Sequence, residues 1–234
     1  MLGGNFEVPP GMIKQAYVRL AQAMPSLVPG GVSVYAGAFP DAPAQGFRRW
    51  LASLGAIYHL DRMIALDIPW WNVAATRDVA SFLQRRPGAR VFEYGSGAST
   101  VWLARRAASV TSVEHDAAWA ARLETRLSGF AHVALHTAPL DPVKPAAEQA
   151  YVRSIAGTGP YDMIVVDGRL RVHCLQQAMA ELKPDGIIVF DDSGRRRYRA
   201  AIVAGPLREK HYFGASYCVP YPDHTSILSA AAWP

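Results

Sequence analysis

The residues whose chemistry stands out first are acids placed where short apolar runs end. Glu114, Asp167 and the pair Asp191-Asp192 each close such a run, as expected at the carboxyl ends of buried strands. In a parallel sheet these ends meet at one edge, and neighbouring strands lie roughly 4.8 Å apart. We therefore expect the carboxylates of Asp167, Asp191 and Asp192 to crowd together, which is costly unless a cation compensates them. A divalent ion with oxygen ligands or an arginine could do so.

A glycine turn precedes the strand that ends at Glu114. Strand Arg90–Tyr94 leads into Gly95-Ser96-Gly97, a helix is predicted over Ser99–Ala107, and strand Ser109–Glu114 follows. Glycines let a backbone approach a ligand closely, and the start of a helix offers free N–H groups. An acid at the end of the second strand can accept both hydroxyls of a ribose. This order predicts the first half of a nucleotide-binding unit. Thr100 replaces the third glycine of the dinucleotide pattern, which weakens the prediction of a nicotinamide cofactor.

The motif Glu93-Tyr94-Gly95-Ser96-Gly97 resembles the first motif of class I methyltransferases that depend on S-adenosylmethionine (SAM). The resemblance implies that residues 94–97 lie under the methionine part of SAM, that Glu114 binds the ribose, and that Thr137 and Ala138 border the adenine. The complete set of cofactor-binding residues that it implies is Glu93, Tyr94, Gly95, Ser96, Gly97, Ser99, Glu114, His115, Thr137, Ala138 and Asp167.

The acids after the fourth and fifth predicted strands also resemble the metal ligands of cation-dependent O-methyltransferases. This partial resemblance implies a site for Mg²⁺ at Asp167, Asp191 and Asp192. The chain departs from that pattern because its second Asp replaces an Asn, and Leu170 stands where the family has a catalytic lysine. We therefore favour arginine as the counter-charge, from Arg169, Arg171 or the run Arg195–Arg197.

The candidates for catalysis are Asp167, Asp191 and His173. A histidine near neutral pH is suited to accept a proton, and His173 follows the fourth strand closely. Asp167 has the alternative role of holding the substrate or the amino group of SAM.

The order of elements predicts an α/β fold: a doubly wound, mostly parallel seven-stranded sheet with a C-terminal antiparallel hairpin, preceded by N-terminal helices. This is the sheet of the class I methyltransferase fold by resemblance. The strands after Ser109–Glu114 are expected at His132–His136, Tyr161–Gly168, Ile187–Phe190, His211–Val219 and Thr225–Ala231. Helices are expected at Gly11–Met24, Gln45–Leu66 (as one or two), Asn72–Arg86, Ala117–Leu127, Ala146–Ile155 and Arg171–Leu182, with a basic helix that ends near Leu207. Lys183–Gly186 is expected to be a turn.

We divide the chain into an N-terminal helical cap, residues 1–71, and a SAM-binding methyltransferase domain, residues 72–234. The cap is rich in aromatic residues that the cofactor fold does not need. We therefore expect its segment Met12–Trp71 to pack over the carboxyl edge of the sheet and to form part of a substrate pocket. These aromatic residues are Phe47, Trp50, Tyr58, Trp70 and Trp71.

Composition narrows the class of protein. Half of the 234 residues are hydrophobic and 18% are charged, which is typical of a globular protein. Two cysteines exclude a disulfide framework, and no signal peptide or membrane span is visible, so we expect a cytoplasmic protein. The net charge is +5 and the pI about 9.4, which is compatible with nucleic acid as a substrate. Two features argue against nucleic acid: the arginines are spread along the chain, and Asp167-Gly168-Arg169 stands where base-amino methyltransferases carry an Asn/Asp-Pro-Pro-Tyr type of motif.

The sequence thus predicts a SAM-dependent methyltransferase that acts on an oxygen or nitrogen of a small molecule, without a membrane partner and with a homodimer left open. Methylation of nucleic acid, above all RNA, is a less favoured alternative. A non-catalytic protein that binds SAM or a nucleotide is the alternative from a different class, and a nicotinamide dehydrogenase is weaker.

Overall fold

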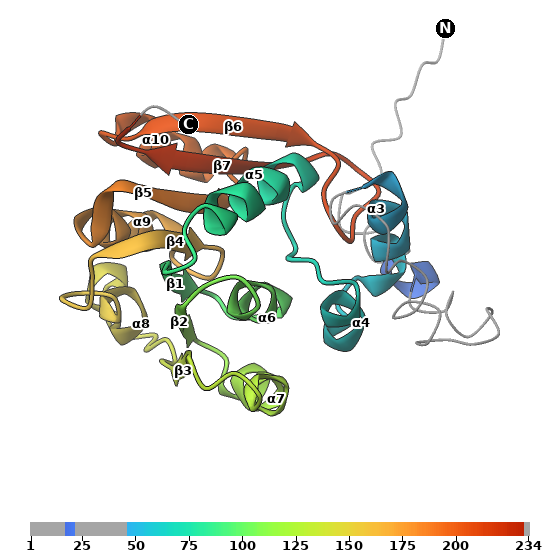
Figure 1. Cartoon of the computed structure of the whole chain (residues 1–234). Helices are drawn as coiled ribbons and strands as arrows, with labels where there is room; N and C mark the ends of the chain where they lie inside the picture. Colours follow the sequence, from blue (N-terminus) through green and yellow to red (C-terminus); the bar gives the residue numbers. More distant parts are fainter. Residues whose placement is uncertain (1–16, 22–45, 232–234) are drawn as a thin grey trace, which may run out of the picture.

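A single seven-stranded sheet organises the chain (Figure 1). The computed structural model describes residues 17–21 and 46–231, and within them the strand order is β3-β2-β1-β4-β5-β7-β6. Strands β1 to β5 are parallel, whereas β7 is antiparallel to both β5 and β6. The predicted fold class, including the terminal hairpin, is therefore confirmed. The strands are β1 (Arg90–Tyr94), β2 (Ser109–Glu114), β3 (Val133–Thr137), β4 (Tyr161–Val166), β5 (Leu182–Asp191), β6 (Arg208–Gly214) and β7 (Asp223–Ser229).

Helices cover both faces of the sheet because successive strand residues point to opposite sides. Val91 and Met163 pack in the core with α5 and α6, whereas Phe92 and Ile164 pack in the core with α8, α9 and α10. β4 is buried along its whole length, which is why its sequence is a continuous apolar run. The helices of the sheet region are α5 (Val73–Gln84), α6 (Ala98–Ala104), α7 (Ala117–Leu127), α8 (Ala150–Arg153), α9 (Arg171–Ala180) and α10 (Arg196–Ala204), with a 3-10 turn at Ala146–Glu148.

Two of the helix starts predicted from the sequence carry side-chain caps. The Asn72 side chain accepts hydrogen bonds from the N–H groups of Ala74 and Ala75 at 2.9 and 3.2 Å. The Asp116 carboxylate accepts one from Trp119 N–H at 3.0 Å. Such caps satisfy N–H groups that have no partner within the helix.

Several predicted boundaries are wrong. Lys183–Gly186 belongs to β5, where an irregularity in the pairing with β4 absorbs the proline and glycine. β6 begins at Arg208, before the predicted His211, because it is the last strand in the sheet order and its charged residues need not be buried. Residues 215–222 form the loop between β6 and β7 instead of extending a strand.

The N-terminal helices α3 (Phe47–Ser53) and α4 (Leu60–Ala65) are joined by a 3-10 turn, Leu54–Ala56, so the predicted segment contains two helices. They lie beyond the right-hand end of the sheet in Figure 1, where the β6 arrow ends. Since β7 is antiparallel to both β5 and β6, this end is also the carboxyl end of β5 and of the strands parallel to it. The described residues of the cap segment therefore lie at the edge of the sheet where the sequence analysis expects them. The predicted helix Gly11–Met24 is described only at residues 17–21, which are helical, and Val32–Pro43 lies outside the described residues.

Apolar packing and an ion pair fix these helices. Ile57, Leu60 and Met63 share a core with Ala98 and Val101 of α6 and with the 217–219 segment. Asp67 forms ion pairs with Arg105, at 2.8 Å, and with Arg106. Among the described residues, none of the helices combines the length and the apolar composition that crossing a bilayer requires.

Candidate active site

The glycine turn after β1 lies directly against the turn after β4. Gly95 has φ +91, a conformation that favours glycine, and a Cβ there would lie 2.6 Å from Gly168 Cα. A Cβ on Gly168 would in turn lie 1.9 Å from the Tyr151 hydroxyl. The two turns can meet only because both positions lack a side chain, and together they form the floor of a cavity.

Glu114 is buried at the end of β2 and faces the glycine turn. Its Oε2 accepts hydrogen bonds from the backbone N–H and the hydroxyl of Ser96, at 2.9 and 3.0 Å. Its Oε1 accepts the N–H groups of His115 and Asp116, both at 2.9 Å. These bonds hold the carboxylate toward the turn at the position where the sequence predicts a ribose ligand.

Glu93 lies behind the turn and does not line the cavity, and its contact with the cofactor stays a prediction. Its carboxylate is fully buried and accepts hydrogen bonds from the hydroxyls of Ser99, Thr100 and Ser112, at 2.6, 2.5 and 2.7 Å. Burial raises the pKa of Glu93 to about 7, although these three hydroxyls lower it in part. Glu93 therefore ties β1, β2 and the start of α6 together.

The cavity above the two turns has a volume of about 960 Å³. It joins the glycine turn and Glu114 to the acids after β4 and β5, and three residues of the N-terminal helical segment contribute to its wall. These three residues are Tyr58, Met63 and Trp70.

The predicted site residues divide into those that line this cavity and those that do not. Lining residues that the sequence identified are Gly95, Ser96, Gly97, Ser99, Glu114, His115, Asp167, His173, Asp191 and Asp192. Glu93, Tyr94, Thr137 and Ala138 are absent from the lining. Side chains within a strand point to its faces and not to its end; accordingly, the Tyr94 hydroxyl donates to Val152 O, at 2.7 Å, in the core. Beyond β3, Leu140 lines the cavity instead of Thr137 and Ala138.

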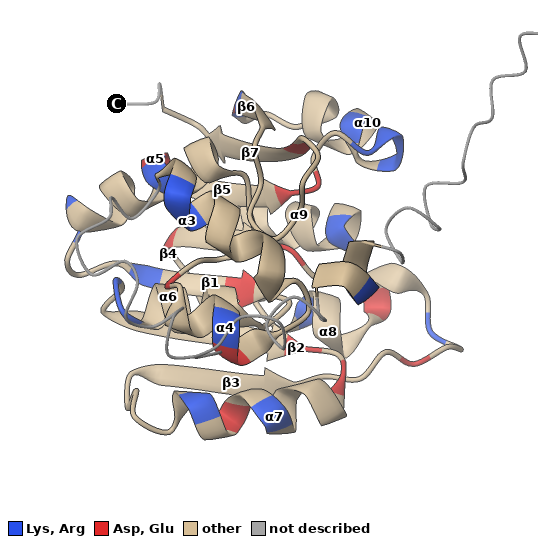
Figure 2. Cartoon of the chain, turned by 90° about the vertical axis from the view of Figure 1, so that its right-hand side faces the viewer, with Lys and Arg blue, Asp and Glu red and all other residues tan. Residues whose placement is uncertain are grey.

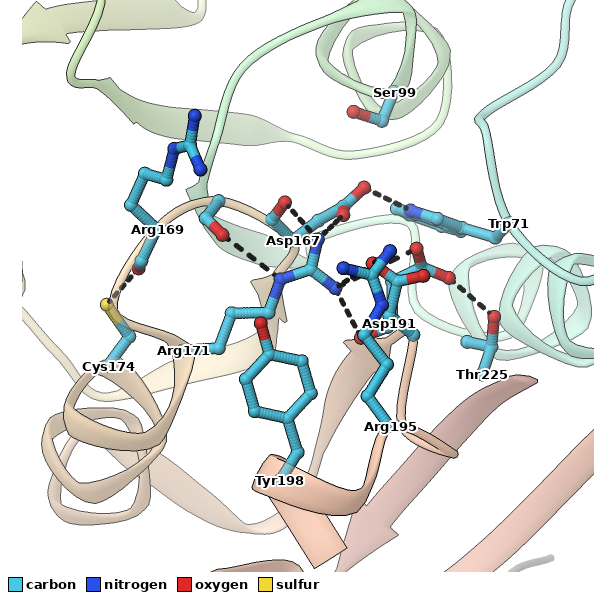
Figure 3. A network of polar contacts seen from close by, with 12 residues as sticks. Trp71, Ser99, Asp167, Arg169, Arg171, Cys174, Asp191, Arg195, Tyr198 and Thr225 are labelled. Carbon is cyan, nitrogen blue, oxygen red and sulfur yellow. Dashed lines mark hydrogen bonds and ion pairs between the residues drawn. The ribbon is translucent and has the colours of Figure 1, made fainter. Parts of the chain in front are cut away.

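The acids after β4 and β5 converge on Arg171, as Figure 3 shows. The Arg171 guanidinium is 2.8 Å from an Asp167 carboxylate oxygen, 3.1 Å from one of Asp192 and 3.9 Å from one of Asp191. It also donates to the main-chain oxygens of Gly168, Asp167 and Asp191. Arg195 adds a second ion pair to Asp192, at 2.7 Å. The expectation that arginine supplies the counter-charge is confirmed.

This arrangement does not fit a divalent metal between the three acids. Arg171 is buried and its guanidinium contacts all three carboxylates, so it occupies the space that a shared cation would need. Within the described part of the chain, no group of three or more His, Cys, Asp or Glu residues could hold a metal ion.

Even with two arginines present, Asp167 and Asp191 hold protons more tightly than ordinary carboxylates, because their pKa values are raised. Burial raises the pKa of Asp167 to about 6, Arg171 lowers it and Asp192 raises it again. Burial, followed by Asp167 and Asp192, raises the pKa of Asp191 well above its ordinary value. The Asp167–Asp191 pair is therefore suited to accept or share a proton.

The turns that carry these acids have strained backbones. Leu170 and Asp192 have φ values of 51 and 56, which non-glycine residues rarely adopt and which cost on the order of 1–3 kcal/mol each. Leu170 is the N-cap of α9, so this turn places Arg171 at the helix start, four residues after Asp167. Asp192 turns the chain away at the end of β5.

The sequence did not indicate how the N-terminal segment joins this network. Trp71 Nε1–H donates to Asp167 at 3.2 Å. The Thr225 hydroxyl donates to Asp191 at 2.7 Å and accepts from Asn72 N–H at 3.1 Å. Thr225 is completely buried and connects the segment before α5 to the acid on β5.

Comparison with known proteins agrees with this geometry. Residues 92–193, from β1 to just beyond β5, match the family model described as a methyltransferase domain. This match places a methyltransferase domain on the strands and turns that carry the site, and the sheet has the class I methyltransferase fold. No curated protein matches its sequence.

Several solved structures of methyltransferases resemble this chain at low sequence identity. A SAM-dependent O-methyltransferase from Thermotoga maritima has a TM-score of 0.52 and 14% identity, covering 77% of this chain and 72% of that one. An rRNA methylase from Streptococcus thermophilus has a TM-score of 0.48 and 12% identity, covering 65% and 95%. A putative methyltransferase from Streptococcus mutans in complex with SAH (S-adenosylhomocysteine) has a TM-score of 0.47 and 12% identity, covering 65% and 96%. At 14% identity the likeness to the Thermotoga maritima structure shows the fold alone, and the two structures with TM-scores below 0.5 carry no argument.

Proposed function

We propose that this methyltransferase transfers the methyl group of SAM to an oxygen or nitrogen of a small molecule. The observation that supports this most is the single cavity in which the glycine turn and Glu114, the buried acids, and a wall from the N-terminal segment meet. Tyr58, Met63 and Trp70 form part of the wall of the cavity that the acids also line, which favours a compact acceptor over a folded nucleic acid.

SAM would lie over the glycine turn with its ribose toward Glu114. In the structure, Ser96 supplies two of the donors to Glu114, one from its backbone and one from its hydroxyl. A ribose hydroxyl can take the place of the Ser96 hydroxyl by a rotation of that side chain, and the backbone bonds that orient Glu114 stay in place. Trp119 lines the same end of the cavity, and its Nε1–H donates to Ser96 O at 2.9 Å, which holds the turn in position.

The transfer itself is a displacement at carbon. The acceptor atom forms a bond to the methyl carbon while the bond from that carbon to the sulfonium sulfur breaks, and the sulfur leaves as a neutral thioether. The enzyme contributes alignment and exclusion of water. Asp167 lines the cavity, and its pKa of about 6 makes it a stronger base than an ordinary carboxylate. We therefore propose that Asp167 accepts the proton that the acceptor atom loses. His173, which also lines the cavity, is the alternative base.

The proposal is tested by methyl transfer from radiolabelled SAM to two fractions of a cell extract, metabolites below about 3 kDa and purified RNA. We expect label in the metabolite fraction, little in RNA, and loss of label with Asp167→Asn at saturating SAM. Calorimetry with SAH, SAM and NAD accompanies the assay.

Each other outcome identifies a competing function. Label in RNA alone would show a nucleic-acid methyltransferase. Tight SAH binding without transfer to either fraction would show a non-catalytic binder. NAD binding without SAM binding would overturn the cofactor assignment.

A further inference from the structure

The wall of the cavity beyond the acids is formed by the start of α10. Arg195, Arg197 and Tyr198 line it from that helix, and Tyr221 and Asp223 line it from the loop before β7 and the start of that strand. Figure 2 shows basic residues gathered on α10. In the strand order β2-β1-β4-β5, the glycine turn and Glu114 follow β1 and β2, whereas α10 follows β5. We therefore expect this wall to face the acceptor and not the nucleoside.

The arginines of the cavity differ in their partners. Arg171 and Arg195 are engaged by the acids. Arg197, in contrast, forms no ion pair within the described part of the chain; its Nη2 donates to the Tyr198 hydroxyl at 2.9 Å. Two arginines elsewhere, Arg199 and Arg126, have acidic partners in Glu209 and Asp61. Arg197 is thus a permanent cation on a cavity wall, available to an anion from outside the chain.

Tyr198 orients this cation. The Arg197 guanidinium lies 4.7 Å from the centre of the Tyr198 ring, and the ring is buried against Phe190 at the end of β5. Arg171 lies near the same ring, 5.7 Å from its centre. One aromatic ring therefore stands between Arg171, which holds the acids, and Arg197 on the cavity wall.

The helix and the neighbouring acid agree with an anion at this wall. No side chain caps the start of α10, a nine-residue helix whose positive end adds to the charge of Arg197. Asp223 also lines the cavity, and burial raises the pKa of its carboxyl, which lessens its repulsion of an anion.

We propose that the methyl acceptor carries an anionic oxygen group, a carboxylate or a phosphate, which Arg197 binds while the reacting hydroxyl or amine reaches the acids after β4 and β5. This inference rests on the proposed transfer to a small molecule and specifies its substrate class. Charge-assisted hydrogen bonds from a guanidinium to such groups are short and strong.

The test uses the full-length enzyme, radiolabelled SAM and the metabolite fraction of the source cells. Labelled product is passed over an anion exchanger at pH 8, before and after treatment with alkaline phosphatase. We expect the product to be retained. Retention lost after phosphatase identifies a phosphate, and retention that resists the phosphatase identifies a carboxylate.

Variants then connect the charge to Arg197. Arg197→Gln should lower kcat/KM for the retained acceptor about tenfold or more, while the Kd for SAH stays within about twofold. Arg196→Gln is the matched control because Arg196 is an exposed neighbour on the same helix that does not line the cavity; it should behave as the unsubstituted enzyme.

The outcomes separate the inference from the function on which it rests. A labelled product that flows through the exchanger overturns the inference alone. The inference is also overturned if kcat/KM falls equally in both variants, or if it does not fall with Arg197→Gln. It is overturned as well if Arg197→Gln weakens SAH binding by the same factor, because Arg197 would then bind the cofactor. Label absent from the metabolite fraction overturns the proposed function itself.

Discussion

Replacement of Glu93 by Gln should raise the stability of the fold at alkaline pH. Glu93 has an ordinary pKa of 4.5 in the unfolded chain and one of about 7 in the fold, chiefly because of burial. Below pH 4.5 both states are protonated and the group has no effect. Between pH 4.5 and about 7 the Glu93 carboxyl is ionised in the unfolded chain but still protonated in the fold, so the free energy of unfolding falls as the pH rises. Above pH 7 the carboxyl is ionised in both states, and the loss of stability stays constant. At about 1.4 kcal/mol per pKa unit, the loss is on the order of 3 kcal/mol.

Glutamine keeps the shape of the side chain and removes this dependence. Its amide oxygen can accept from Thr100 and Ser112 as the Glu93 Oε2 does, while its NH₂ group donates to the Ser99 hydroxyl, which can reverse its role. The variant should therefore fold, and its free energy of unfolding should exceed that of the unsubstituted protein by an amount that grows from pH 5 to pH 8.

The assay is urea unfolding at pH 5, 6, 7 and 8, followed by circular dichroism. Asp167 and Asp191 also have raised pKa values, but both proteins contain them, so the difference between the proteins isolates Glu93. Glu124→Gln, at an exposed position of α7, is the control and should show no growing difference. The reasoning would be refuted if the free energies of unfolding of the Glu93→Gln variant and the unsubstituted protein differed by the same amount at every pH from 5 to 8. SAH affinity should change less than about threefold, because Glu93 does not line the cavity.

Three further changes test the site. Glu114→Ala should weaken SAH binding by about 1.5–3 kcal/mol in calorimetry, the value of hydrogen bonds to a charged acceptor; an unchanged Kd would remove Glu114 from the cofactor site. Arg171→Met should destabilise the fold by about 3–5 kcal/mol in urea unfolding, because it leaves buried carboxylates unpaired, and adding Asp191→Asn should recover part of this loss of stability. EDTA should leave the turnover of the unsubstituted enzyme unchanged. A requirement for added Mg²⁺ would contradict the assignment of Arg171 as the counter-charge. Gly168→Ala should lower the melting temperature and SAH affinity, since its Cβ would overlap the Tyr151 hydroxyl, and Tyr151→Phe should restore part of both; a Gly168→Ala protein as stable as the parent would show that the two turns can separate without cost.

The sequence determined those features that depend on residues close together in the chain. The continuous apolar run of β4 and the caps at Asn72 and Asp116 are local patterns, and the structure contains all three where they were expected. The convergence of Glu114, Asp167 and Asp191 also followed from the sequence, because a parallel sheet brings strand ends to one edge whatever the loops do.

Other features required knowledge of which face a side chain occupies. Glu93 and Tyr94 are neighbours in the cofactor motif, yet one bonds to α6 and the other enters the opposite core. The alternation of side chains along a strand was the available signal that neither reaches the cavity. The start of β6 depended on its place as the last strand of the sheet, which only the pairing with β7 establishes.

Only the tertiary structure decided which group compensates the acids. Several arginines follow the strands, and the sequence does not rank Arg171 above Arg169. The left-handed turn at Leu170 aims Arg171 back at Asp167, while Trp71 and Thr225 approach from distant segments. The balance of charge in a buried site depends on distances of a few ångströms between side chains from three or more elements, and such distances are a property of the packed fold and not of any stretch of the chain.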